Sequence, residues 1–302
     1  MSCSALKFTP VVIIGAGRSG TNALRDMLTR LPEFATWTCD EINPIWRHGN
    51  LSWPNDEIPA ANATPLVRRF IRGAFERLWH QAAQPRFVVE KTCANTLRVP
   101  FVDAILPEAK YVHIVRSGVD VVASARKRWQ GDLELPGLPY FTAKARYTPL
   151  SDLPIYGWSF VKSRVGLMLG KTKRLSVWGP RFDGMQALDG APLEEICARQ
   201  WAACVSHADD AFAQIDPARV LTLRYEDFTA NPAGSLAAIL TFLGTEASDS
   251  DIATAAGPVR STSVGKGRAL LSDLPTEALD IMQAPLAAHG YTTTKIPTEY
   301  GE

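Results

Sequence analysis

Residues 11–28 carry the sequence VVIIGAGRSGTNALRDML, and this stretch predicts the fold. Its first four residues are all apolar, which is typical of a central strand of a parallel sheet because such strands are buried on both faces. A glycine-rich turn follows, and apolar residues at helical spacing then continue as far as Pro32. A strand, a glycine-rich turn and a helix together form a cradle in which backbone N–H groups bind phosphate.

The rest of the chain alternates between apolar runs and helical patterns. These patterns predict strands at 34–39, 87–91, 110–116 and 220–225, and helices after Thr64-Pro65, from Gly118 to about Trp129, over 193–214 and over 233–243. The alternation predicts an α/β fold with a P-loop-like parallel sheet flanked by helices on both faces. Ligands of such sheets bind at the carboxyl ends of the strands. Other basic residues are expected on solvated helix surfaces: Arg68, Arg69, Arg72, Arg77 and Arg98.

Length and composition set limits on the organisation of the chain. Its 302 residues suit one large domain or two small ones, and we expect a single domain over residues 1–302. The stretch 130–182 is rich in Gly, Pro and aromatic residues, and we expect an irregular cap or lid over about 130–192. The net charge of +1 gives no field that would attract nucleic acid or an anionic membrane, so neither is an expected partner.

Cysteine usage and hydropathy bear on the location of the protein. The five cysteines form no C-x-x-C pair, which indicates reduced thiols and no metal site. We expect no signal peptide, and without an apolar stretch of 18 residues the sequence predicts no membrane span. These features together lead us to expect a cytoplasmic protein.

The residue types in the glycine turn leave three interpretations open. In the first, Gly15, Gly17 and Gly20 form the G-x-G-x-x-G of a dinucleotide-binding fold. Asp40 and Glu41 then lie about 20 residues further on, where such folds hold a ribose. This interpretation would make the protein an NAD(P)- or FAD-dependent oxidoreductase with a Rossmann fold.

In the second interpretation, the same spacing is the frame of a nucleoside-triphosphate loop. Thr21 then stands where that loop needs Lys, and Asn22 stands where it needs Ser or Thr to hold Mg²⁺. The absence of both groups weighs against an ATP- or GTP-dependent enzyme. In the third interpretation, Arg18 provides the positive charge inside the loop and no metal is needed, because an Arg fork suits a tetrahedral oxyanion.

A second motif favours the third interpretation. The sequence YVHIVRSGVDVVASARKRW (111–129) puts Arg116 at the end of a predicted strand, and a predicted helix follows. Ser124 and Arg128 are four residues apart and therefore share one face of that helix. These three side chains can converge on a second phosphate group. Two anion sites on one sheet imply a ligand with two separated phosphate groups.

The two motifs together resemble those of the sulfotransferases that use 3′-phosphoadenylyl sulfate (PAPS). GAGRSGTNAL resembles the family's loop for the 5′-phosphosulfate, and HIVRSGVDVVAS resembles its 3′-phosphate motif. The cytosolic small-molecule enzymes carry Lys and a catalytic His where this chain has Arg18 and Cys93. The Arg form looks more like the tyrosylprotein sulfotransferases and many bacterial relatives. Three more stretches resemble family segments in the same order: EKTCANTLRVP (90–100), VLTLRYEDF (220–228) and STSVGKGRALL (261–271).

The resemblance implies an enzyme that transfers a sulfuryl group from its co-substrate PAPS to an acceptor hydroxyl or amine and releases adenosine 3′,5′-bisphosphate (PAP). It implies Glu41 as the general base, with Asp40 as the alternative, and Arg18 and Lys91 as catalytic cations without a metal. The acceptor would be a small molecule, a carbohydrate or a peptide, with a carbohydrate or metabolite favoured, and the oligomeric state stays open. A nucleotide-binding module that has lost catalysis is the non-enzymatic alternative. The implied nucleotide-binding residues are Gly17, Arg18, Ser19, Gly20, Thr21, Asn22, Arg116, Ser124, Arg128, Tyr225, Lys266, Gly267 and Arg268.

Overall fold

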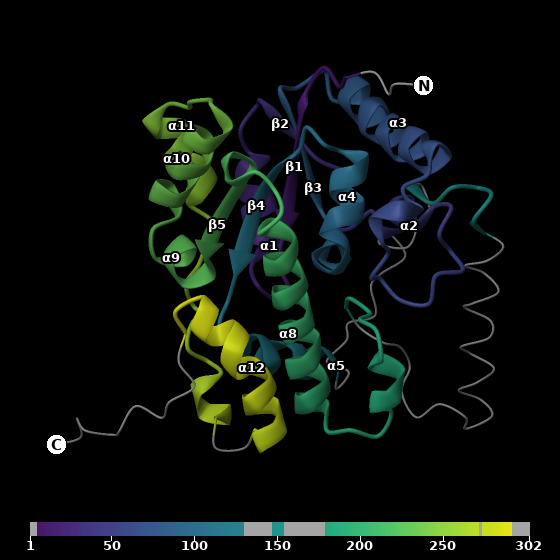
Figure 1. The fold of residues 1–302 in the computed structure, drawn as a ribbon. Coiled ribbons are helices and arrows are strands. Elements are labelled where there is room, and N and C mark those ends of the chain that lie inside the picture. Colours follow the sequence, from purple (N-terminus) through teal and green to yellow (C-terminus); the bar gives the residue numbers. More distant parts are fainter. Residues whose placement is uncertain (1–4, 130–146, 154–178, 272–273, 292–302) are drawn as a thin grey trace.

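The protein is described by a computed structural model that covers residues 5–129, 147–153, 179–271 and 274–291. In these residues five parallel strands form one sheet, in the order β2-β3-β1-β4-β5 (Figure 1). This arrangement confirms the predicted parallel sheet. The strands are β1 (Thr9–Ile14), β2 (Phe34–Ala35), β3 (Phe87–Lys91), β4 (Lys110–Val115) and β5 (Val220–Arg224).

The second strand is much shorter than the predicted 34–39. β2 pairs with β3 only at Phe34 and Ala35, where the ring of Phe34 stacks on that of Phe87 at 4.7 Å. Trp37 then buries its ring edge-on against Phe75, with ring centroids 4.8 Å apart. The chain therefore leaves the sheet after Ala35 because the indole packs into the helical layer instead of continuing the ladder.

The strand order decides what lies beside the glycine turn. β1 lies between β3 and β4, with Ile13 opposite Lys91 and Ile14 opposite His113. A dinucleotide-binding fold would place its second strand beside the first, in the order 3-2-1-4-5. The observed order therefore argues against the oxidoreductase alternative. It also places the end of β3, with Lys91, next to the start of the turn.

Helices cover both faces of the sheet, as predicted. Successive residues of a strand point to opposite faces, and those of β1 accordingly enter two separate cores. Val12 and Ile14 pack with residues of α3 (Pro65–Gln81), α4 (Val99–Ile105) and α8 (Leu193–Phe212). Val11 and Ile13 pack with residues of α1 (Thr21–Leu28), α10 (Pro232–Leu243) and α11 (Asp249–Ala256) on the other face (Figure 1).

A third core lies beyond the carboxyl ends of the strands. It joins α8 to α5 (Gly118–Trp129) and α12 (Thr276–Ala288), which lies alongside α8 in Figure 1. Gly118 starts α5 where a Cβ atom would lie 2.8 Å from the ring of Trp201, so α5 packs closely on α8. The other helices of the described residues are α2 (Asn43–Arg47), α9 (Tyr225–Ala230) and the short 3₁₀ helices η1 (Ala60–Asn62), η2 (Cys93–Arg98), η3 (Met185–Leu188), η4 (Pro217–Arg219) and η5 (Arg268–Leu270).

The helix predicted after Thr64-Pro65 begins as its sequence implies. The Thr64 side chain accepts a hydrogen bond from the N–H of Val67, which is the geometry of an N-cap. The prediction that Arg72 is solvated is wrong, because its guanidinium is buried and donates to both carboxylate oxygens of Glu108, at 2.7 and 3.0 Å. It also donates to the carbonyl of Ile105, so the end of α4 covers this flank of α3.

The predicted cap at 130–192 falls largely on residues that the structure does not describe, and only 147–153 and 179–192 are included. The second of these segments contains η3 and is tied to the rest of the fold by Asp56, whose carboxylate accepts from the N–H of Arg181 at 2.9 Å. No helix among the described residues combines the length and the apolar character needed to cross a membrane.

Candidate functional site

The glycine turn between β1 and α1 is shaped by close contacts with its neighbours. A Cβ atom on Gly15 would lie 2.7 Å from the carbonyl oxygen of Ile114, and one on Gly20 would lie 2.4 Å from the ring of Tyr225. Gly20 has a φ of +87°, and Arg18 has a φ of +71°, a conformation that costs an L-residue about 1–2 kcal/mol. Backbone strain of this kind is concentrated at functional sites.

The N-terminus of α1 opens toward this turn. The helix begins at Thr21, its N-cap is Gly20, and no side chain caps it. Its first turn contains no acidic residue that would compensate the positive end of the helix dipole. Uncapped backbone N–H groups at a helix N-terminus form a ready anion site.

Arg116, at the end of β4, connects three of the predicted motifs. Its Nη1 donates to the backbone carbonyl of Arg18 at 2.9 Å, and its Nη2 donates to the carbonyl of Ser263 in the C-terminal loop. Its guanidinium carbon lies 4.4 Å from the ring centre of Tyr225, in a cation–π contact. The structure thus brings together the glycine turn, the end of β4, the residue after β5 and the 261–271 loop.

Two buried polar atoms in this region have no hydrogen-bond partner among the described residues. They are Oγ of Ser19 and Nε of Arg116. An unpaired buried polar atom costs about 1–3 kcal/mol, more when it is charged, so native structures rarely leave one unsatisfied. Both atoms can donate, and phosphate or sulfate oxygens would accept from them. The residues present therefore fit an anionic ligand in this cradle.

Arg18 and Ser124 lie closer together than the sequence implies. Arg18 Nε donates to Ser124 Oγ at 2.9 Å, although the sequence assigns them to opposite ends of a ligand. The two predicted phosphate sites therefore share one continuous surface. The third member of the second motif, Arg128, lies in the last turn of α5, and its side chain is outside the described part of the chain.

The C-terminal loop is held by Asp120, a residue that sequence reasoning missed. The Asp120 carboxylate accepts hydrogen bonds from the N–H of Gly265 at 2.7 Å and of Gly267 at 2.6 Å. A Cβ atom on Gly267 would lie 2.5 Å from the backbone of Val119, so glycine allows the loop to lie directly on the start of α5. The side chain of Lys266, between the two glycines, is exposed.

A second group of charged residues lies at the end of β3. Lys91 is buried, and its Nζ donates to Oδ1 of Asp40 at 3.0 Å and to Oε1 of Glu41 at 3.2 Å. Burial lowers the pKa of Lys91, but Cys93 and the two carboxylates together more than compensate and hold the pKa above its ordinary value. The ammonium group therefore stays charged at every physiological pH.

Glu41 and Asp40 differ in their surroundings. Oε1 of Glu41 accepts from Lys91 and from the N–H of Cys93, each at 3.2 Å. Asp40 also pairs with Arg25 at 3.1 Å. Burial raises the pKa of Asp40, but the charges and hydrogen bonds of Lys91 and Arg25 lower it by more than burial raises it. The pKa of Asp40 is therefore below its usual range. A carboxylate with a lowered pKa is a weak base, which makes Asp40 the poorer candidate.

Comparison of the sequence with known protein families identifies the family of the chain. Residues 10–138 and 174–249 match the family model described as "Sulfotransferase family". The chain belongs to the sulfotransferase family. The predicted family is thereby confirmed, and the protein is a sulfotransferase.

Solved structures resemble this sulfotransferase in fold. The sulfotransferase domain from the curacin biosynthetic pathway aligns over 95% of this chain and 99% of its own, with a TM-score of 0.56 and 15% identity. The sulfotransferase from Alicyclobacillus acidocaldarius aligns over 95% and 98%, with a TM-score of 0.51 and 15% identity. Sulfotransferase STF9 from Mycobacterium avium aligns over 95% and 78%, with a TM-score of 0.50 and 12% identity. No curated protein sequence matches this chain significantly.

In this sulfotransferase the anion cradle lies next to the charged group formed by Lys91, Asp40 and Glu41. Thr21, the first residue of α1, has its Oγ1 3.7 Å from Sγ of Cys93, whose N–H donates to Glu41. Burial raises the pKa of the Cys93 thiol well above its ordinary value, and the Glu41 carboxylate raises it further. The thiol is therefore protonated and unsuited to act as a nucleophile. Cys93 instead joins the anion cradle to the carboxylates.

Two predicted residues of the C-terminal loop make no side-chain contact with the cradle. Lys266 and Arg268 lie on the anchored C-terminal loop, but their side chains are exposed and make no hydrogen bond to the described residues. Asn22 is exposed on the first turn of α1, and Gly17 is half-buried. The prediction that Arg98 lies on a helix surface is wrong, because its side chain is fully buried in η2 and burial lowers its pKa to about 10.

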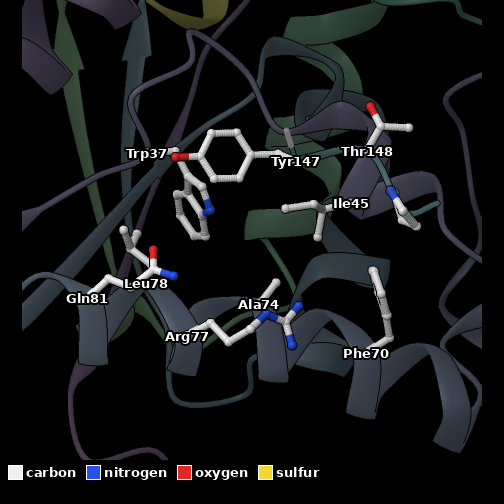
Figure 2. A pocket seen from close by; sticks show the side chains of 10 residues that line it. Trp37, Ile45, Phe70, Ala74, Arg77, Leu78, Gln81, Tyr147 and Thr148 are labelled. Atoms are coloured by element: carbon white, nitrogen blue, oxygen red, sulfur yellow. The ribbon is translucent and has the colours of Figure 1, made fainter. Parts of the chain in front are cut away.

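A small cavity lies near the segment that carries Glu41. It has a volume of about 240 Å³ and lies between α3 and residues 147–149. Figure 2 shows the rings of Trp37 and Tyr147 on one side and the side chains of Phe70, Ala74 and Arg77 on the other. The hydroxyl of Tyr147 is 3.0 Å from Oγ1 of Thr38, which holds this wall to the segment that follows β2.

Proposed function

We propose that this sulfotransferase uses PAPS as its co-substrate, transfers the sulfuryl group to an acceptor hydroxyl or amine, and releases PAP. One observation carries the proposal. The buried donors Ser19 Oγ and Arg116 Nε have no partner among the described residues, in a cradle that two predicted phosphate motifs share. A nucleotide with phosphate groups at both its 3′ and 5′ positions would supply acceptors for both motifs.

Different residues of the cradle would bind different parts of the nucleotide. Residues 17–22 and the N-terminus of α1 would hold the 5′-phosphosulfate through backbone N–H groups. Arg116 and Ser124 would hold the 3′-phosphate, and Tyr225, whose ring packs against the guanidinium of Arg116, would contact the nucleotide. The predicted contacts of Lys266, Gly267, Arg268 and Arg128 belong to the same proposal.

PAPS would provide the sulfuryl group, and the chain's own cations would stabilise the negative charge that develops on the leaving phosphate. Arg18 lies in the turn, and Lys91 is fixed at the end of the neighbouring strand with its charge assured by two carboxylates. Fixed donors of this kind contribute about 10²–10³ each in rate. Glu41 would take the acceptor proton, a step worth about 10²–10⁴.

The acceptor would enter from the side of Glu41. Aromatic residues Trp37 and Tyr147 lie near this segment, and the predicted cap over 130–192 would complete the acceptor side. We propose a small-molecule, carbohydrate or peptide acceptor, and favour a carbohydrate or other metabolite. The cysteines among the described residues are all free, which supports a cytoplasmic location.

Ligand-induced stabilisation tests the nucleotide assignment. PAP, NAD⁺, ATP with Mg²⁺ and GTP with Mg²⁺ are compared in a thermal unfolding assay. PAP at a hundredfold excess over its dissociation constant is expected to add about 2.7 kcal/mol of stability without any metal. Stabilisation by NAD⁺ alone would instead favour the oxidoreductase. Transfer is then measured with radiolabelled PAPS and 2-naphthol, chitotriose, a tyrosine peptide or water as acceptors.

A further inference from the structure

A chain of hydrogen bonds begins directly after Glu41 and runs into the end of β3. The backbone N–H of Ile42 donates to Oγ1 of Thr92 at 3.2 Å. The Thr92 hydroxyl in turn donates to Oε1 of Glu90 at 2.5 Å. Glu90, Thr92 and Ile42 are buried, so water does not compete for these bonds.

The chain of hydrogen bonds continues through η2 and returns to the residue after Ile42. Asn95 Nδ2 donates to the second carboxylate oxygen of Glu90 at 2.8 Å. Arg98 Nε donates to Oδ1 of Asn95 at 2.8 Å, and Arg98 Nη2 donates to Oδ1 of Asn43 at 2.6 Å. Because Ile42 and Asn43 are consecutive in the chain, the peptide bond between them closes these hydrogen bonds into a ring. We call it the Glu90 ring, and its members are Ile42, Thr92, Glu90, Asn95, Arg98 and Asn43.

We propose that the Glu90 ring is a positioning device that fixes the backbone after Glu41 to the element that carries Lys91, and so holds the Glu41 carboxylate in place for proton transfer. This proposal rests on the proposed role of Glu41 as the base. Outside the ring, the Glu41 carboxylate is held by the ammonium of Lys91 and the N–H of Cys93, and its backbone carbonyl accepts from Sγ of Cys39 at 3.7 Å.

The composition of the ring supports a role beyond stability. Glu90, Thr92, Asn95 and Arg98 are all fully buried. Replacing a buried ionic network by apolar side chains is often neutral or stabilising, so a core selected for stability alone does not need such a network. What the ring provides is direction, because each of its hydrogen bonds joins one fixed donor to one fixed acceptor. A displacement of about 1 Å in a catalytic group can lower the rate about 10²-fold, which is the loss that the ring prevents.

The first test follows the ring in the free protein and needs no substrate. Thr92→Val removes both bonds of the hydroxyl while keeping the side-chain shape, and Thr92→Ser retains the hydroxyl. Hydrogen exchange of the Ile42 amide is expected to be about fivefold faster in Thr92→Val, as for the loss of one net hydrogen bond, and unchanged in Thr92→Ser. Equal exchange in both variants would overturn the proposal. Asn43→Ala, at a half-buried position, tests the far end of the ring if Thr92→Val does not fold.

The second test measures PAP release from PAPS with each acceptor of the panel and with water alone. We expect kcat to fall about 10- to 100-fold in Thr92→Val and in Asn43→Ala, while the KM for PAPS stays within about twofold and Thr92→Ser restores turnover. Arg72→Met is the matched control, because it removes a buried arginine of a separate ion pair, with Glu108. Its turnover is expected to equal that of the wild type.

Glu41→Gln, measured in parallel, distinguishes a failure of the positioning proposal from a failure of the proposed function. If Glu41→Gln loses turnover while Thr92→Val and Asn43→Ala keep it, the Glu90 ring does not position the base and the proposed function stands. If Glu41→Gln turns over like the wild type, the base assignment falls and the positioning proposal falls with it.

Discussion

Arg116 donates a hydrogen bond from Nη1 to the backbone carbonyl of Arg18 at 2.9 Å, and this bond joins the loops that follow two adjacent strands. β1 and β4 pair in parallel up to Ile14 and His113, so both loops leave the same edge of the sheet. The same guanidinium reaches the carbonyl of Ser263, far along the chain. The buried guanidinium of Arg116 therefore holds three loops together. Its Nε has no hydrogen-bond partner among the described residues.

The position of Arg116 predicts its effect on nucleotide binding. Arg116→Ala removes a charged donor and the support of two loops, so we expect the dissociation constant of PAP to rise about 10- to 100-fold, since a bond to a charged group is worth about 1.5–3 kcal/mol. Isothermal titration calorimetry measures this change. Arg126→Ala, which removes a basic residue of α5 that pairs with Glu194, should bind PAP like the wild type. An unchanged dissociation constant in Arg116→Ala would remove the residue from the nucleotide site.

The two neighbouring carboxylates should respond differently to neutralisation. Glu41→Gln is expected to lower kcat about 10²- to 10⁴-fold with little change in PAP affinity, because the base acts on the acceptor. Asp40→Asn should change kcat by less than about fivefold, the size of effect expected for a partly exposed ion pair. Steady-state kinetics of both variants decide between them. The opposite ranking would make Asp40 the base.

Asp120, which anchors the C-terminal loop, gives a prediction that can be tested without measuring catalysis. Asp120→Ala removes the acceptor of two backbone N–H groups, so the loop that carries Lys266 and Arg268 should detach more often. We expect trypsin to cleave after these two residues at least about tenfold faster, as for the loss of about 1.5 kcal/mol. PAP affinity should fall in parallel.

Two further variants control for this interpretation. Asp120→Asn keeps one acceptor oxygen and should show a smaller effect than Asp120→Ala. Asp251→Ala removes an acid from the first turn of α11, away from the loop, and should leave the cleavage rate unchanged. Equal cleavage of Asp120→Ala and the wild type would mean that the loop is held by other contacts.

Much of this fold follows from local rules in the sequence. Apolar runs that end in a glycine or a charged residue predicted the strands and the edge at which the site lies, because parallel strands bring their carboxyl ends to one edge. The resemblance to sulfotransferases added the order of the motifs, and the family is confirmed. The contact between Arg18 and Ser124 could not be predicted, because it depends on a side-chain direction in a loop.

The two wrong predictions about arginine side chains share a physical cause. Helical periodicity separates an apolar face from a polar one, but it does not show whether another segment covers the polar flank. Arg72 is covered by Glu108 and the end of α4, and Arg98 is enclosed by Asn43 and Asn95. Asp120 escaped notice because an acid in the first turn of a helix ordinarily serves the helix dipole.

The buried carboxyl of Glu90 gives the stability of the protein a distinct dependence on pH. Burial raises its pKa to about 7 from an ordinary value of 4.5, although the hydrogen bond from Thr92 and the charge of Arg98 oppose this. Between these two pH values the folded state keeps a proton that the unfolded chain has released. Stability linked to Glu90 is therefore complete below pH 4.5 and lost as the pH rises through 7, by about 3 kcal/mol at most.

His113 acts in the opposite direction over an overlapping interval. Burial lowers its pKa to about 4 from an ordinary 6.5, against the attraction of Asp209, so its contribution is lost as the pH falls from 6.5 toward 4. In Glu90→Gln only the histidine effect should remain, and the unfolding free energy should rise with pH between 4.5 and 6.5. In His113→Gln it should fall with pH over the same interval. Urea unfolding at several pH values measures both slopes, and parallel slopes in the two variants would show that neither group titrates as its burial requires.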